Sequence, residues 1–249
     1  MCCFSGPVDR VSETSIFARS QPGGRQALVY EMRFSSKDDV AMILPIPTPV
    51  GAAEDAVRFI DLQDYPDFFR ALQSAFPTRA LSIKEDTMAK PGAAPPAPLP
   101  VVDVGAFEAS FVPSVKDFER LDARFRLPGK TWDSLPAYRA FGFAVFKLKK
   151  GDRKVHPMAF EFPRAHAGKL FFPTVHIHDG LVHAKATFDH ALYGQSGEQD
   201  TVSFQGWRES PRPAGQYVNL AKSKGLVDGG RHLYHQRMQG ERKNEDIVL

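Results

Sequence analysis

Closely spaced glycines and prolines divide this chain into short β-prone runs, and this spacing most limits what it can fold into. Such runs occur at residues 12–19, 25–34, 40–44, 57–62, 101–112, 140–148 and 156–162. Most connections between them have hairpin length, and no repeated strand–helix–strand alternation indicates a parallel sheet. We therefore predict an α+β fold, predominantly antiparallel β-sheet with two or three helices.

Two segments have helical rather than strand-like patterns. Between residues 64 and 76, Asp64 is suited to cap a helix whose buried stripe is Phe68, Leu72 and Phe76. A second helix is predicted over residues 114–124, again with a capping residue at its start.

A proline-rich segment interrupts the pattern near the middle of the chain. It contains the run K-P-G-A-A-P-P-A-P-L-P, which is typical of an extended linker or surface loop. A length of 249 residues suffices for one large β-rich domain or two smaller ones. We predict a single domain over 1–249. The alternative is an N-terminal lobe (1–84) and a histidine-bearing C-terminal lobe (101–249), joined by a linker at 85–100.

Residues 174–193, T-V-H-I-H-D-G-L-V-H-A-K-A-T-F-D-H-A-L-Y, hold four of the eight histidines in the chain. The dipeptide Asp179-Gly180 between two β-prone runs predicts a two-residue type I′ turn. In that hairpin His176 lies opposite His183, and His178 shares their face because side chains alternate along a strand. Opposed Cβ atoms lie roughly 5 Å apart and diagonal ones roughly 7–8 Å apart, so three imidazoles can reach one ion.

We therefore predict a metal site formed by His176, His178 and His183. Zinc or copper suits three imidazoles best, and iron is an alternative. Asp189 and His190 are the nearest groups able to orient a ligand or carry a proton, although alternation from His183 directs His190 to the other face. A slip of one residue in register would separate the three histidines, in which case they are ordinary surface or core residues.

The first residues, Met-Cys-Cys, suggest a second reactive group. Removal of Met1 would place an α-amine with a pKa of about 8 beside the thiol of Cys2, with a pKa of about 8.5. The pair can chelate a soft metal, or the amine can act as base for a thiol nucleophile, as in an N-terminal cysteine hydrolase. The alternative is that both cysteines simply pack beneath a neighbouring strand.

Composition excludes several classes of function. The net charge is only +3 and no basic stripe is interleaved with aromatic residues, so we expect no nucleic-acid partner. No run approaches the roughly 18 apolar residues of a membrane span, and the N-terminus lacks the pattern of a secretory signal. Two adjacent cysteines exclude a disulfide framework. We expect a cytoplasmic protein that does not contact membranes.

The opening C-C-F-S-G-P-V-D-R-V-S-E-T-S-I-F-A resembles the start of a large bacterial family known only as a domain of unknown function. The segments V-A-M-I-L-P-I-P-T-P, F-G-F-A-V-F-K-L and H-P-M-A-F-E-F-P follow in a similar order. The resemblance covers about two thirds of the chain and implies no established activity. The chain departs from the family in placing its cysteines at the initiator methionine and in carrying the cluster H-I-H-D-G-x-x-H.

The sequence leaves open whether the protein is an enzyme. The main prediction is a metal-binding protein, either with or without a metal-dependent hydrolytic or redox activity. One alternative is a non-enzymatic β-rich module that binds or assembles with another protein, and the other is the N-terminal cysteine hydrolase. The expected partners are a metal ion and either a small molecule or a protein.

Overall fold

The computed structural model describes residues 2–77, 102–104, 107–121, 126–127, 129–133, 135–177, 181–197 and 202–249. The predicted linker at 85–100 lies outside these ranges, as do His178 and the predicted turn at Asp179-Gly180.

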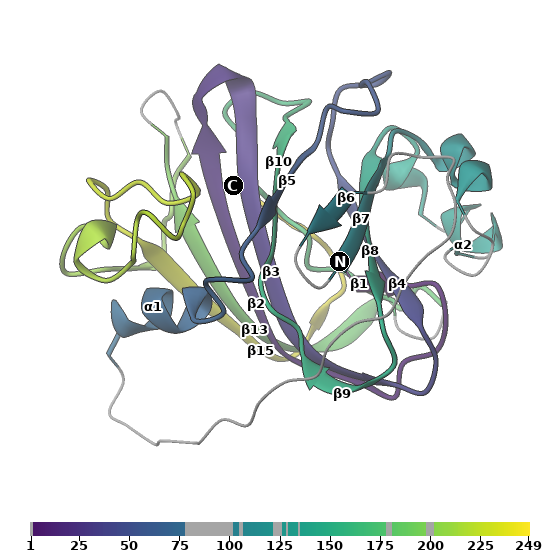
Figure 1. The fold of residues 1–249 in the computed structure, drawn as a ribbon, viewed down its shortest axis with the longest axis horizontal. Coiled ribbons are helices and arrows are strands. Elements are labelled where there is room, and N and C mark those ends of the chain that lie inside the picture. Colours follow the sequence, from purple (N-terminus) through teal and green to yellow (C-terminus); the bar gives the residue numbers. More distant parts are fainter. Residues whose placement is uncertain are drawn as a thin grey trace.

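Two β-sheets form most of the described structure (Figure 1). The eight-stranded sheet has the order β14 (Arg208–Glu209), β15 (Tyr234–Lys243), β13 (Lys185–Gln195), β2 (Arg10–Gln21), β3 (Arg25–Ser36), β10 (Met158–Pro163) and β5 (Arg58–Asp61), with β9 (Gly151–Lys154) also paired to β3. The six-stranded sheet has the order β12 (His176–Ile177), β1 (Cys2–Phe4), β4 (Val40–Ile46), β8 (Gly142–Leu148), β7 (Phe107–Val112) and β6 (Val102–Val104). A small third sheet pairs β11 (Phe171–Phe172) with β16 (Ile247–Val248).

The helices are short and lie outside the sheets. Those in the described part of the chain are the α-helices α1 (Phe68–Ser74) and α2 (Gly129–Asp133) and the 3₁₀ helices η1 (Pro22–Gly24), η2 (Val115–Arg120), η4 (Pro136–Tyr138) and η5 (Ala214–Gln216). Helix α1 begins three residues later than predicted, with Asp67 rather than Asp64 at the N-cap, because Pro66 disfavours the helical conformation at Tyr65. The predicted stripe of Phe68, Leu72 and Phe76 is buried, as expected. None of the helices described is long and apolar enough to cross a membrane.

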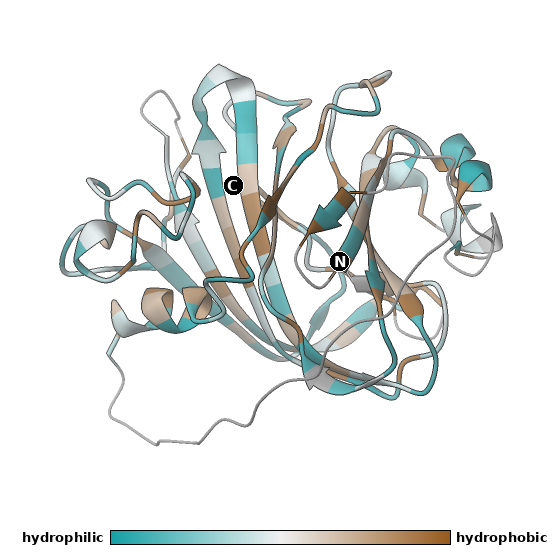
Figure 2. Cartoon of the chain, in the orientation of Figure 1, coloured by the Kyte–Doolittle hydropathy of each residue, from teal (hydrophilic) through white to brown (hydrophobic). Residues whose placement is uncertain are grey.

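Alternating side chains bury both faces of the long strands. On β3, Leu28 and Tyr30 point into a core between the two sheets, whereas Val29 points into a second core beneath α1. On β4, Met42 points into the core between the sheets and Ile43 into a third core beneath η2 and α2. Figure 2 shows apolar residues along the middle of β2 and β3, with hydrophilic residues toward their shared hairpin. The result is a sandwich whose outer faces are covered as well.

The prediction of a β-rich fold with few helices is confirmed, but the sheets are mixed rather than purely antiparallel. Strand β13 runs parallel to β2, and β12 runs parallel to β1. Each parallel pair joins an early strand to a late one, because parallel neighbours need a long connection rather than a hairpin. The core between the sheets contains residues from both sides of the segment at 85–100, including Tyr30 and Phe146.

Candidate functional site

Two histidines meet where the two sheets lie close together. His176 is on β12, the edge of the six-stranded sheet, and His190 is on β13 in the eight-stranded sheet. Their Nε2 atoms are 3.0 Å apart, which is hydrogen-bond distance. Either ring can donate, depending on the tautomer, and the contact links the two sheets by a side-chain hydrogen bond.

Strand alternation places both rings. Phe188 and Leu192 flank His190 at spacings of two and point into the core between the sheets, so His190 points there too and is only 2% exposed. On β12, Ile177 points into the core beneath α2, which turns His176 inward. The Phe188 ring completes a triangle, with its centroid 4.7 Å from His176 and 5.3 Å from His190.

The chain end fixes the position of β12 by side-chain hydrogen bonds. Asn244 Oδ1 accepts from the His176 backbone N–H at 2.7 Å, and Asn244 Nδ2 donates to the carbonyls of His176 at 2.9 Å and His183 at 3.0 Å. Asp246 Oδ1 accepts from the N–H groups of Thr174 and Val175 at 2.8 and 3.0 Å. The side chains of Asn244 and Asp246 thus hydrogen-bond backbone groups of this segment, as the backbone of a neighbouring strand would.

Asp246 also reaches across to η4. Its Oδ2 accepts a hydrogen bond of 2.6 Å from the hydroxyl of Tyr138, which is 4% exposed. Burial, followed by the Asp246 carboxylate, raises the pKa of the Tyr138 hydroxyl. Sequence reasoning missed Tyr138, Asn244 and Asp246, because their partners are distant in the chain.

An open cavity of about 460 Å³ adjoins the histidine pair. Its lining includes His176, His183 and His190, together with Ser12 and Thr14 from β2. A β-bulge between Ser12 and Ser15, with Glu13 at a φ of 54°, shapes the β2 side of the cavity. Such bulges redirect side chains, and they often occur beside functional sites.

The predicted hairpin is wrong in the described residues. His176 pairs with Cys2 on β1 instead of lying opposite His183. Strand β13 begins at Lys185, so His183 lies before the strand. Alternation from His183 directs His190 to the opposite face, and its side chain is indeed buried there with Phe188 and Leu192. What the predicted hairpin does not include is that His176 reaches this face from the other sheet. His178 lies outside the described residues, so the predicted three-histidine set stays a prediction.

The remaining predicted residues have ordinary structural neighbours. Asp189 is exposed and pairs with Arg237 on β15, Nη2 to Oδ1 at 3.3 Å. Cys2 is in register with His176, which places the N-terminal strand beside the histidine pair. Within the described ranges no group of three His, Cys, Asp or Glu side chains is assembled to hold a metal ion.

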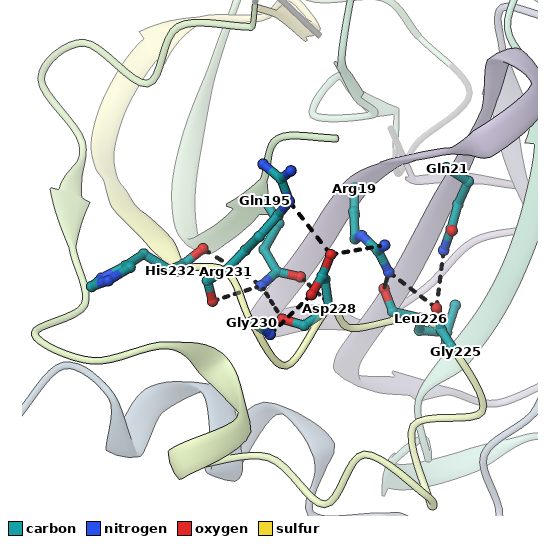
Figure 3. A network of polar contacts seen from close by, with 9 residues as sticks. All are labelled: Arg19, Gln21, Gln195, Gly225, Leu226, Asp228, Gly230, Arg231 and His232. Carbon is teal, nitrogen blue, oxygen red and sulfur yellow. Dashed lines mark hydrogen bonds and ion pairs between the residues drawn. The ribbon is translucent and has the colours of Figure 1, made fainter. Parts of the chain in front are cut away.

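A second polar network fixes an irregular excursion onto the outer face of the eight-stranded sheet (Figure 3). Arg19 on β2 donates to the carbonyls of Gly225 and Leu226 at 3.1 and 3.2 Å. Gln195, the last residue of β13, exchanges two hydrogen bonds of 3.0 Å with the backbone of Asp228. The Asp228 carboxylate lies 3.4 Å from Arg231 and 3.6 Å from Arg19. These contacts give residues 225–232 a fixed shape at the surface without assembling a reactive group.

The fold is similar to that of baculovirus P35. A crystal structure of P35 aligns over 97% of this chain and 96% of P35, with a TM-score of 0.51 and 12% sequence identity. Other matches are a caspase-8/P35 complex (TM-score 0.46, 13% identity, covering 96% of this chain and 95% of P35) and a mutated P35 after caspase cleavage (TM-score 0.46, 15% identity, 96% and 97%). No protein-family model matches the sequence, and a search of curated proteins finds no significant relative. The resemblance to a bacterial family stays a prediction.

Proposed function

We propose that this protein is a non-enzymatic β-rich module that binds another protein, and that its partner is a protease of the caspase class. The observation that supports the proposal most directly is the similarity of fold to P35 over nearly the whole of both chains. Solved structures of P35 include a caspase-8/P35 complex and a mutated P35 after caspase cleavage.

The chemistry of the described surface favours binding over catalysis. The two side chains that the sequence suggested as proton carriers have structural partners: Asp189 pairs with Arg237, and His190 contacts His176. The outer face carries an irregular segment held in one shape by Arg19 and Gln195. A surface ordered in advance loses little entropy on association, which suits a protein that binds a partner.

The sequence suggests where a caspase would act. Caspases hydrolyse the peptide bond that follows an aspartate. Residues 78–100, which lie outside the described structure, contain one aspartate, Asp86, and their proline content predicts an extended chain. We infer that the bond after Asp86 is the one that the protease cuts.

The test is binding of the full-length protein to active caspase-8, followed by biolayer interferometry and by mass spectrometry of the products. We expect wild type to bind and to be cut after Asp86, and Asp86→Ala to bind at least tenfold more weakly. The matched control is Asp55→Ala, which removes an exposed aspartate from a turn and should behave as wild type. A folded wild type that neither binds caspase-8 nor is cut by it contradicts the caspase assignment.

A further inference from the structure

We propose that His176 and His190 are two ligands of a transition-metal site between the sheets, with His183 as the third imidazole and zinc or copper(II) as the ion. This set differs from the one the sequence predicts, because His190 takes the place of His178. The inference is independent of the protein-binding function proposed above.

The geometry of the pair is close to that of two ligands on one ion. Imidazole nitrogens bind zinc at about 2.0–2.1 Å with tetrahedral angles, which places two of them roughly 3.3 Å apart. The two Nε2 atoms are already 3.0 Å apart, so the ion needs them to separate by only a few tenths of an ångström. The ring that donates from Nε2 would shift its proton to Nδ1, so both imidazoles stay neutral.

The surroundings hold both rings in this arrangement. His190 is only 2% exposed and Phe188 packs against both imidazoles, which limits their rotation. The Asn244 amide fixes the backbone of His176 through both its N–H and its carbonyl. Ligands held in place before the ion arrives lose less entropy on binding it.

The third imidazole lies on the same cavity. His183 lines the cavity with His176 and His190, and Asn244 Nδ2 donates to both the His176 and the His183 carbonyls. One side-chain amide therefore tethers the two backbones. The three groups are not yet gathered around one point in the described structure, so the exposed side chain of His183 must rotate inward.

Among the described residues of this cavity wall, the one cationic side chain points to an acidic partner on β15. Lys185 also lines the cavity, but its Nζ lies 3.0 Å from Glu241 Oε1 in an ion pair with β15. A bound ion would join β12 of one sheet to β13 of the other and so stabilise the sandwich, by a free energy that rises with the logarithm of the ratio of ion concentration to Kd.

The test is titration of zinc chloride into untagged full-length protein by isothermal calorimetry, with thermal unfolding measured with and without the ion. We expect one zinc per chain and a raised Tm in wild type. His183→Gln should weaken binding at least tenfold, and His190→Gln should abolish the rise in Tm. His166→Gln removes an exposed histidine from a different cavity and should bind zinc as wild type does.

Cobalt(II) provides a second measurement that does not depend on stability. Visible absorption typical of tetrahedral nitrogen ligation should appear in wild type and in His166→Gln, and be lost in His183→Gln. The proposal is overturned if wild type binds no zinc, or if folded His183→Gln and His190→Gln bind it as tightly as wild type.

Discussion

The imidazole of His235 lies between two aromatic rings, with centroids 5.1 Å from Phe76 and 4.9 Å from Tyr193. Burial, with further contributions from Arg208 and Arg237, lowers its pKa from 6.5 to about 4. An imidazole that titrates near pH 6.5 in the unfolded chain therefore binds a proton less readily once folded. The stability that depends on neutral His235 is fully present above pH 6.5 and is lost as the pH falls toward 4.

We predict that His235→Phe reduces this loss of stability on acidification. The free energy of unfolding, measured by urea denaturation at pH 7 and pH 4.5, should fall less in the variant than in wild type. Glu31 has the opposite effect on stability, because burial raises its pKa to about 7 and the folded state binds its proton more readily. Variant and wild type are therefore compared with each other at each pH, so that the contribution of Glu31 cancels. An equal fall in the free energy of unfolding of both proteins would contradict the role given to His235 in acid sensitivity.

At the residue scale, the sequence predicts which side chains are buried better than it predicts which of them meet. Phe68 and Leu72 were predictable because helical spacing determines which face of α1 packs inward, and Phe76 is buried too although α1 ends at Ser74. Alternation directs His190 away from the face of His183, and the side chain is buried with Phe188 and Leu192. No local pattern predicts that His176 meets it from the other sheet.

At the scale of elements, the C-terminal segment joins parts that the chain order keeps apart. Asp246 accepts hydrogen bonds from Thr174, Val175 and Tyr138, and β16 pairs with β11. A buried hydroxyl or N–H left without its acceptor costs about 1–3 kcal/mol. We therefore expect this short segment to contribute measurably to the free energy of unfolding, because three donors depend on one of its side chains.

We predict that Asp246→Ala lowers the free energy of unfolding by about 2–3 kcal/mol, since it leaves the Tyr138 hydroxyl and two backbone N–H groups without their acceptor. The matched control is Glu245→Ala, whose side chain is exposed and pairs only with Lys243 among the contacts described. Surface pairs of this kind contribute less than about 1 kcal/mol. Urea denaturation measures both, and equal losses would contradict the role given to Asp246.

Most strands were predictable as elements because each has its own local pattern. Strands β2 and β3 and the turn between them follow from two apolar runs separated by Pro22-Gly23-Gly24. The partners of β12 were not predictable, because the acceptors and donors that fix it come from Asn244 and Asp246 rather than from a facing hairpin strand. Side-chain hydrogen bonds over such distances leave no periodic trace in the sequence.

At the scale of the whole molecule, the order of strands is decided by contacts between distant segments. Parallel pairing of β2 with β13 places residues 10–21 beside residues 185–195, and β1 lies between β4 and β12. The alternation of apolar and polar residues predicts the class of such a fold. It does not predict the topology, because a parallel pair has no short turn between its strands that the sequence would reveal. The likeness to baculovirus P35 therefore emerged only from the structure.

At the same scale, segments outside the sheets form much of the outer surface of the described fold. The outer faces of both sheets are covered by α1, by α2 and by the segment that Arg19 holds, so binding surfaces lie on covering segments. Loops and irregular segments on a rigid scaffold are where recognition residues are commonly found.

The most direct measurement is sedimentation velocity of the full-length protein mixed with an equimolar amount of active caspase-8. We predict a species heavier than either component, which contains both proteins and is absent when Asp86→Ala replaces wild type. Sedimentation of the two as independent species at micromolar concentration, with the protein shown to be folded, would contradict the account.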